Sequence, residues 1–287
     1  MEPLVVVLVV AGVVCAFTWI ASLLTKDYSW VDRIWSIVPV AYVWIFAGAS
    51  LVAGRPDARL LLMAVLVTLW GARLTFNFAR KGGYSGVEDY RWPILRARMS
   101  PALYQVFNLL FIVLFQNALL VLITLPSQIA WENRGAPLTG WDVLLAALFL
   151  LFLVGETVAD QQQWRFHGRK RAEAAAGRAV DPPFLTTGLW RFSRHPNFFC
   201  EQAQWWVFYF FGVVAVATSG TLPIWGGLVN WTLAGPLLLT ALFIGSTIFT
   251  ESISASKYPD YARYQRTTSM LVPLPPRGES AAARSHA

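Results

Sequence analysis

Charged residues are scarce in this sequence: they occupy 14% of its 287 positions, whereas hydrophobic residues occupy 56%. A soluble domain carries charge at about a quarter of its positions, so the composition excludes an ordinary soluble fold and indicates an integral membrane protein. Cysteine is scarce too. Its two copies, Cys15 and Cys200, lie far apart in apolar stretches, which excludes a disulfide framework and a cysteine-rich zinc site.

The sequence also lacks the nucleotide-binding signatures of soluble enzymes. No G-x-G-x-x-G segment follows a strand, no Walker loop occurs, and no polar loop is long enough for a Rossmann domain. Any nucleotide must therefore bind among the helices themselves. The three histidines lie in two loops and in the tail, so we expect no metal or haem site.

Seven apolar runs are long enough, or nearly so, to cross a bilayer, which takes about 20 residues of helix. They cover residues 4–24, 34–53, 60–78, 102–125, 143–159, 198–219 and 228–250. The first run lacks the basic start of a signal peptide and is too long for one. We therefore predict an all-α bundle of seven transmembrane helices, a single membrane domain over residues 1–273, and a disordered tail over residues 274–287.

Lysine and arginine are distributed unequally between the two sides of the bilayer that these spans define. If the N-terminus lies outside, 19 of the 23 basic residues fall in inner segments and three fall in outer segments. This asymmetry favours an N-out/C-in orientation, which we expect in a bacterial inner membrane. It also accounts for the net charge of +7 without a nucleic-acid partner.

Ionisable and amide side chains within the spans gather near the inner ends. An ionisable group costs at least ~2.5–3.5 kcal/mol at the bilayer centre, so the depth of such groups is informative. They include Asp32, Arg73, Gln105, Asn108, Glu156, Asp160, Asn197, Glu201 and Glu251. This placement predicts a polar cavity in the cytoplasmic half of the bundle. The alternative is that the side chains extend to the inner membrane interface.

Helical spacing places some of these groups on common faces. Glu156, Asp160 and Gln163 follow an i, i+4, i+7 pattern, and Asn197 and Glu201 are four residues apart. Such stripes can accept hydrogen bonds from ribose hydroxyls or a carboxamide. Cationic neighbours just outside the membrane can hold phosphates; these are Arg191, Arg194 and His195. The alternative for each stripe is a structural hydrogen bond or ion pair between helices.

Several spaced motifs together resemble a known family. They are "GETVADQQQWRF", "GLWRFSRHPNFFCEQAQWW" and "KYPDYARYQRTTSMLVPLPPR" in the C-terminal half, with "KDYSWVDRIWSIVP" and "GGYSGVEDYRW" nearer the N-terminus. In this order they are similar to the steroid 5-alpha-reductase superfamily, and most of all to its bacterial branch, domain of unknown function 1295. The resemblance covers nearly the whole chain.

The resemblance implies a seven-helix membrane fold that binds NADPH in a cavity facing the cytoplasm, formed mainly by residues 140–273. By motif, Asp160, Asn197 and Glu201 would bond polar groups of the cofactor. The residues that would border its phosphates or ribose are Arg91, Arg191, Arg194 and Tyr264. The implied reaction is hydride transfer to a C=C bond conjugated to a carbonyl, in a hydrophobic small molecule that is steroid-, isoprenoid- or lipid-like.

That reaction needs a donor near the substrate carbonyl, where negative charge develops. The steroid enzymes are thought to use a glutamate in helix 2 and a tyrosine in helix 3, and this sequence has neither at those places. The nearest candidates are Asp32, Trp35 and Arg73. Asp32 is either the acid of the reaction or an ion-pair partner of Lys26 or Arg33.

Two other functions fit parts of the pattern. Isoprenylcysteine and phospholipid methyltransferases, which use S-adenosylmethionine, also carry R-H-P before an aromatic region. They place two acids near the end of the last helix, where this sequence has only Glu251. A non-enzymatic protein such as a transporter is the third class. A transport path needs polar groups at the midplane and beyond. Gln116 and Asn117 are the strong polar residues at the midplane, and an interhelical hydrogen bond explains them without a transport path.

Overall fold

The computed structural model describes residues 1–220 and 227–277. Within these ranges the chain forms helices joined by loops and contains no strand, so the fold class is all-α, as predicted. The chain divides into two compact units. The first unit comprises residues 1–150 and 205–239, and the second comprises residues 151–204 and the chain from 240 onward. Of the predicted disordered tail, residues 278–287 lie outside the described residues.

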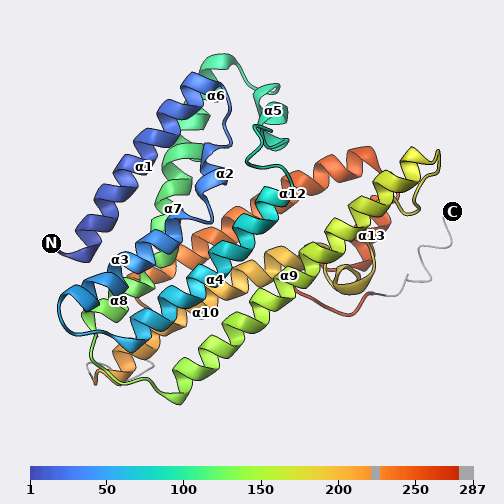
Figure 1. Cartoon of the computed structure of the whole chain (residues 1–287). Helices are drawn as coiled ribbons and strands as arrows, with labels where there is room; N and C mark the ends of the chain where they lie inside the picture. The colour runs from blue at the N-terminus through green and yellow to red at the C-terminus, as the bar shows by residue number, and fades with distance from the viewer. Residues whose placement is uncertain (221–226, 278–287) are drawn as a thin grey trace. The chain divides into compact units, whose positions relative to one another are not determined.

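The first unit is built mainly from the N-terminal helices. Its complete helices are α1 (Pro3–Thr25), α2 (Trp30–Ile34), α3 (Val38–Val52), α4 (Ala58–Arg80), α5 (Arg91–Arg96), α6 (Pro101–Phe107), α7 (Gln116–Thr124) and α8 (Pro126–Glu132). A π-helical stretch, Asn108–Phe115, joins α6 to α7. Figure 1 shows α3 beside α4, and α3 also contacts α1 and α7.

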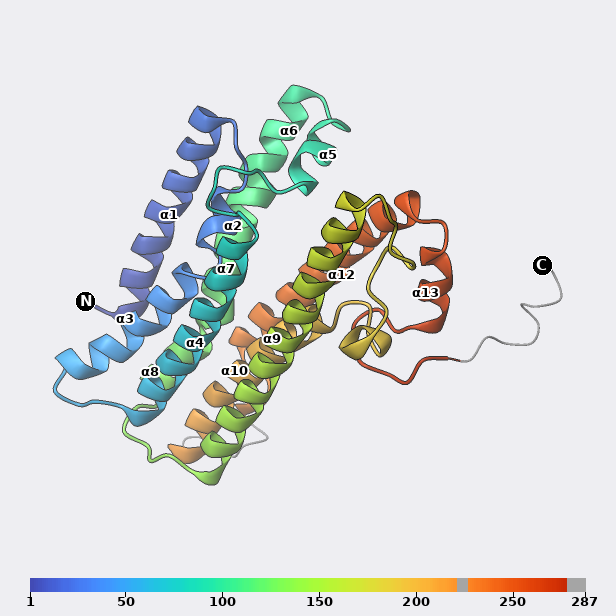
Figure 2. The same ribbon diagram turned by 45° about the vertical axis from the view of Figure 1, so that its right-hand side comes forward.

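Three long helices contribute residues to both units. They are α9 (Gly140–Ala175), α10 (Pro196–Thr218) and α12 (Ala234–Lys257). The second unit also contains a short 3-10 turn, Gly188–Arg191, and α13 (Tyr261–Thr267). In Figure 2, α13 follows directly after the end of α12. A further 3-10 turn, Trp231–Leu233, precedes α12 in the first unit.

Five helical segments among the described residues are long and apolar enough to cross a membrane. They are Pro3–Thr25, Ala58–Arg80, Pro101–Glu132, Gly140–Ala175 and Trp231–Lys257. These segments indicate a multi-pass membrane protein. The count of seven spans, the N-out/C-in orientation and the bacterial inner membrane stay predictions.

Two of the predicted spans differ from these five for physical reasons. The span at 34–53 is shortened because Trp35–Ile37 form a turn, which leaves the 15-residue α3. The span at 198–219 forms α10, which is 23 residues long. Its first half carries Glu201, two glutamines and two tryptophans, and these side chains make α10 less apolar than a lipid-facing helix needs to be.

Short polar side chains join α1 to the segment that contains α6 and α7. Asn108 Nδ2 donates to Ser22 Oγ at 3.0 Å. Asn117 Nδ2 donates to Thr18 Oγ1 at 3.3 Å and to the Val113 carbonyl at 2.8 Å. Asn117 therefore makes the interhelical hydrogen bond that the sequence predicts. The remaining surface of α1 is largely exposed and apolar, which suits contact with lipid.

Buried charges fix the start of α4. The Asp57 side chain caps the helix by accepting a hydrogen bond from the Leu60 N–H at 2.9 Å. Arg59 is 1% exposed and donates to both carboxylate oxygens of Asp142, at 2.6 and 3.0 Å. Arg59 also donates to the Pro137 carbonyl at 3.0 Å. A residue that the sequence places at the edge of a loop is thus a buried structural charge.

Gly71 of α4 lies close to the backbone at Ser36. A substitution at this position therefore tests the packing. A Cβ at this position would lie 2.5 Å from the Ser36 carbonyl oxygen and from Val40 Cγ2. We predict that Gly71→Ala lowers the Tm, because overpacking costs about 1–3 kcal/mol. Gly48→Ala in α3 is the matched control, since a Cβ there meets nothing within 4 Å.

Thermal unfolding of the detergent-solubilised protein, followed by circular dichroism, measures both variants. The Gly48→Ala protein should unfold at the wild-type temperature or above it, because alanine is the better helix former. Equal unfolding temperatures for the two variants would contradict the close contact at Gly71.

Candidate functional site

In the second unit, an arginine just before α10 is held by an acid near the end of α12. Arg194 donates to both carboxylate oxygens of Glu251, at 2.6 and 2.9 Å. Its Nη1 donates to the carbonyl oxygens of Gln265, at 3.0 Å, and Thr268. These bonds occupy four of the five N–H donors of a guanidinium. Arg194 thus joins α10, α12 and the segment around α13, with at most one donor left for a phosphate.

Glu251 is the centre of this cluster. Besides the two bonds from Arg194, it accepts hydrogen bonds from His195 Nε2 at 3.0 Å and Gln265 Nε2 at 2.9 Å. Its side chain is only 6% exposed, and four donors offset the cost of removing the carboxylate from water. In the structure Arg194 and His195 position neighbouring segments, and their predicted contact with phosphates stays a prediction.

The loop that leads into α10 is fixed from two sides. On one side it bonds to the C-terminal segment, through Ser193 Oγ to the Leu271 carbonyl at 2.6 Å and the Arg194 N–H to the Ser269 carbonyl at 2.8 Å. On the other side, Trp190 Nε1 donates to the Ala159 carbonyl of α9 at 3.1 Å. The loop therefore has one defined position relative to these segments of the second unit.

Tyr264 of α13, which is predicted from the sequence to border the cofactor, contacts the same loop. Burial raises the pKa of Tyr264 above its ordinary value, so its phenol stays protonated and donates to the carbonyl of Trp190. Phe184 stacks on the Tyr264 ring with centroids 5.6 Å apart. Arg191 follows Trp190 and is exposed, as a residue that holds a phosphate at the protein surface must be.

The polar stripes of α9 and α10 meet in the second unit. Asn197 Nδ2 donates to Asp160 Oδ1 at 3.2 Å. Gln204 Nε2 donates to Glu156 Oε2 at 2.8 Å. Glu156, Asp160 and Gln204 are buried, at 2%, 3% and 0% exposed. Glu201, one turn beyond Asn197, is 7% exposed. The two stripes therefore face each other, as the alternative of an interhelical hydrogen bond predicts.

These bonds leave the amide oxygens of the stripes without partners. Since a carboxylate can only accept, each amide must turn its nitrogen toward the acid and its oxygen away. The Asn197 Oδ1 and Gln204 Oε1 atoms are buried and accept no hydrogen bond, and the same holds for Gln163 Oε1. A buried acceptor without a donor costs about 1–3 kcal/mol. A ligand with hydroxyl or amide donors would recover this energy.

In the first unit, the loop before α5 folds onto α2 and brings the two N-terminal motifs together. The Asp89 N–H donates to Ser29 Oγ at 2.8 Å. Trp92 Nε1 donates to Asp32 Oδ2 at 2.8 Å, and Arg91 Nη2 lies 3.4 Å from Asp32 Oδ1. Arg91 is closer to Asp89, at 2.8 Å. Asp32 thus pairs with Arg91.

Of the two partners considered from the sequence, Arg33 is bound elsewhere, to Asp27 at 2.5 Å. Asp32 is the acid of this cluster with the most unusual proton affinity. Burial raises the pKa of Asp32 to about 6, against the opposing effect of Arg91, and the like charge of Asp89 contributes to the rise. A carboxyl group with this pKa can hold or release a proton near neutral pH.

The other two residues predicted to take part in catalysis lie in different surroundings. Trp35 is partly buried and packs against the aromatic cluster that contains Tyr28, Trp92 and Tyr104. Arg73 is partly buried on α4. The structure therefore brings together Asp32 with Arg91, Asp160 with Asn197, and Arg194 with His195.

Four residues complete these clusters without a site role assigned from the sequence: Gln204, Glu251, Asp89 and Trp92. Of these, the sequence placed Glu251 among the polar groups at the inner ends of the spans. A signal existed for Gln204, because Asn197, Glu201 and Gln204 repeat the i, i+4, i+7 spacing of the α9 stripe. A signal also existed for Glu251, an acid inside an apolar span that needs a nearby cation. Asp89 and Trp92 carry no such signal, since their roles follow from how a loop folds.

Comparison with known proteins identifies the family. The family model described as "Protein of unknown function (DUF1295)" matches residues 18–268. The chain is 38% identical over 285 residues to the "Uncharacterized protein C594.04c" of Schizosaccharomyces pombe, and the match covers 95% of this chain and 80% of that protein. No solved structure matches the chain. The chain therefore belongs to the DUF1295 family, within the steroid 5-alpha-reductase-like superfamily.

Proposed function

We propose that this protein is a membrane-embedded reductase that uses NADPH to reduce a C=C bond conjugated to a carbonyl in a hydrophobic substrate. The observation that carries the proposal is the pair of buried amide oxygens, on Asn197 and Gln204, left without donors beside the paired acids of α9. Membership of the superfamily supports the same cofactor.

The residues of the second unit fit the polar groups of a dinucleotide. Asp160, Asn197 and Glu201 would accept hydrogen bonds from ribose hydroxyls or from the N–H groups of a carboxamide. The exposed Arg191 would hold a phosphate by charge-assisted hydrogen bonds. Arg194 and Tyr264 would act by holding the surrounding loop in place. When bound, NADPH supplies the hydride.

The reaction also consumes one proton, and Asp32 is the residue we assign to carry it. Hydride addition at the β-carbon sends an electron pair toward the carbonyl oxygen, where a donor stabilises the charge. With a pKa of about 6, the Asp32 carboxyl is partly protonated near neutral pH. Trp92 Nε1 binds Asp32 Oδ2 at 2.8 Å and so fixes the orientation of the carboxyl group.

The first test concerns the cofactor. We predict that NADPH raises the Tm of the detergent-solubilised protein, whereas S-adenosylmethionine does not. The double substitution Asn197→Ala with Glu201→Ala should weaken NADPH binding at least tenfold, because it removes two side chains whose oxygens would accept hydrogen bonds from the cofactor. Glu173→Ala, on the exposed end of α9, is the control and should leave binding unchanged.

Two outcomes would contradict the proposal that NADPH is the cofactor. One is stabilisation by S-adenosylmethionine alone, which would support the methyltransferase alternative. The other is unchanged NADPH affinity in the double variant when its circular dichroism spectrum matches that of the wild type.

The second test concerns the proton of Asp32. We predict that Asp32 loses its proton near pH 6 in the folded protein, against an ordinary value of 3.8. Because the folded-state pKa is raised, Asp32 contributes stability at low pH, and this contribution is lost as the pH rises through about 6. Infrared difference spectra between the wild type and Asp32→Asn, recorded across this pH range, isolate the carboxyl band. A midpoint below pH 4 would contradict the assignment.

A further inference from the structure

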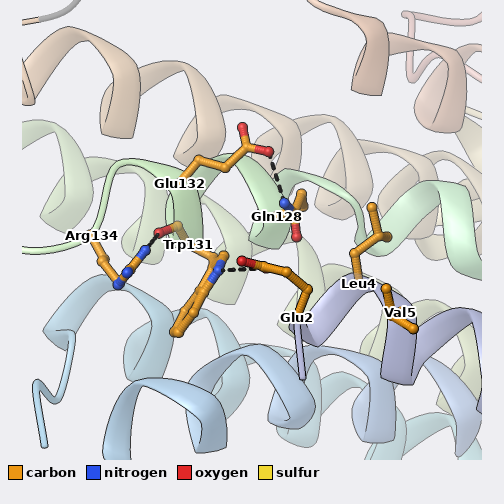
Figure 3. Close-up of a pocket in the computed structure, with 7 residues that line it drawn as sticks. All are labelled: Glu2, Leu4, Val5, Gln128, Trp131, Glu132 and Arg134. Carbon is orange, nitrogen blue, oxygen red and sulfur yellow. Dashed lines mark hydrogen bonds between the residues drawn. The ribbon is translucent and has the colours of Figure 1, made fainter. Parts of the chain in front are cut away.

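A separate pocket lies in the first unit, where the start of α1 meets the end of α8. Figure 3 shows its lining side chains, which come from these two helices, from Glu2 just before α1 and from Arg134 just after α8. Its volume of about 470 Å³ lies within the range of small-molecule sites. It belongs to the first unit and contains no residue assigned above to the reductase.

One buried acceptor in this pocket has no donor. Gln128 is 6% exposed, and its Nε2 donates to Glu132 Oε1 at 2.8 Å. Because a carboxylate only accepts, this bond fixes which way the amide faces. Gln128 Oε1 accepts no hydrogen bond. In Figure 3 this oxygen is turned away from Glu132, toward the side of the pocket that holds Glu2 and Leu4.

The pocket also contains two carboxylates, those of Glu2 and Glu132. Glu2 Oε2 accepts a hydrogen bond from Trp131 Nε1 at 3.3 Å, and Glu132 accepts the bond from Gln128. Among the described residues neither acid forms an ion pair with a basic side chain. Two carboxylates and an amide oxygen together are acceptors that suit a ligand with several N–H donors on a positive centre.

A cation completes the pocket at its other end. The Arg134 guanidinium lies 4.1 Å over the Trp131 ring and donates from Nη1 to the Trp131 carbonyl at 2.9 Å. The stacking holds the guanidinium in one orientation, and its remaining N–H donors suit an anion. The pocket thus offers an acidic end and a basic end to one ligand.

The position of the pocket indicates that such a ligand can come from the membrane. It lies at the start of Pro3–Thr25 and at the end of Pro101–Glu132, two segments long and apolar enough to cross a membrane. Helix ends of this kind lie at the level of lipid headgroups. Leu4 and Val5 line the pocket, and the exposed Leu8 and Val9 continue the apolar surface along α1, where acyl chains can lie.

We propose that this pocket binds an aminoalkyl phosphate of the phosphoethanolamine type, carried by a membrane phospholipid. The primary ammonium donates its three N–H groups to Glu2, Glu132 and Gln128 Oε1. The phosphate accepts from Arg134. A choline headgroup lacks N–H donors, and a glycerol headgroup lacks the positive charge, so neither satisfies the buried oxygen and the two acids together.

Native mass spectrometry of the full-length protein in detergent tests the proposal. The probes are dioctanoyl phosphatidylethanolamine, phosphatidylcholine and phosphatidylglycerol, together with free phosphoethanolamine. We expect the ethanolamine lipid to bind at least tenfold more tightly than the other two lipids, and more tightly than the free headgroup. If the ethanolamine lipid and free phosphoethanolamine bind with equal affinity, the pocket recognises the phosphoethanolamine group, but its ligand is a soluble molecule and not a membrane lipid.

Variants identify the residues. Glu2→Gln with Glu132→Gln should weaken binding of the ethanolamine lipid at least tenfold, and Glu173→Gln, which removes a carboxylate of the second unit, is the control. Gln128→Leu should have a similar effect on binding while preserving the fold, since it removes a buried polar group whose oxygen has no partner. NADPH affinity should be unchanged in all of these variants.

Two results would overturn the proposal. One is equal binding of the three lipids by the wild type. The other is wild-type lipid affinity in both the double variant and Gln128→Leu. Neither result bears on the reductase, because NADPH binding is measured separately on the same proteins.

Discussion

The constraint that the rest of this structure depends on is that a charge removed from water must meet an opposite charge or hydrogen-bonding groups that compensate it. Two buried arginines satisfy it with bidentate carboxylates, Arg59 with Asp142 and Arg194 with Glu251. Removing one member of such a pair costs about 3–5 kcal/mol, because the other charge is left buried and alone. Each pair joins segments far apart in the sequence, so charge pairing fixes the positions of helices that apolar packing alone would leave adjustable.

The same constraint explains the composition of the candidate cofactor site. The acids Glu156 and Asp160 accept hydrogen bonds from the amides of Gln204 and Asn197. An amide satisfies a carboxylate with its nitrogen and keeps an oxygen in reserve, whereas an arginine has only donors. A site built from acids and amides therefore keeps acceptors for a ligand after its internal hydrogen bonds are made. The Glu251 cluster shows the opposite case, since its donors are almost all used within the protein and its role is to hold the loop before α10.

The sequence predicts those features that depend on local spacing. The all-α class, the stripes of α9 and α10, and the family follow from hydropathy, the i, i+4 pattern and motif order. The choice of partner does not follow, because Glu251 and Arg194 are separated by 56 intervening positions and meet only in the folded chain. The count of seven spans stays a prediction for a related reason: the turn at Trp35–Ile37 shortens α3, and the polar start of α10 lowers its apolar character, although both lie in apolar runs.

Asp32 shows how burial can outweigh a nearby cation in setting the pKa of a carboxyl group. Arg91 lies between two acids but is closer to Asp89, at 2.8 Å, than to Asp32, at 3.4 Å. Burial opposes ionisation of Asp32 most, Arg91 favours it, and the negative charge of Asp89 opposes it further. Desolvation then exceeds the attraction that remains, and the pKa of Asp32 rises. The loop before α5 thus brings Asp89 and Arg91 to a buried carboxyl group on α2, whose raised pKa is set mainly by its removal from water.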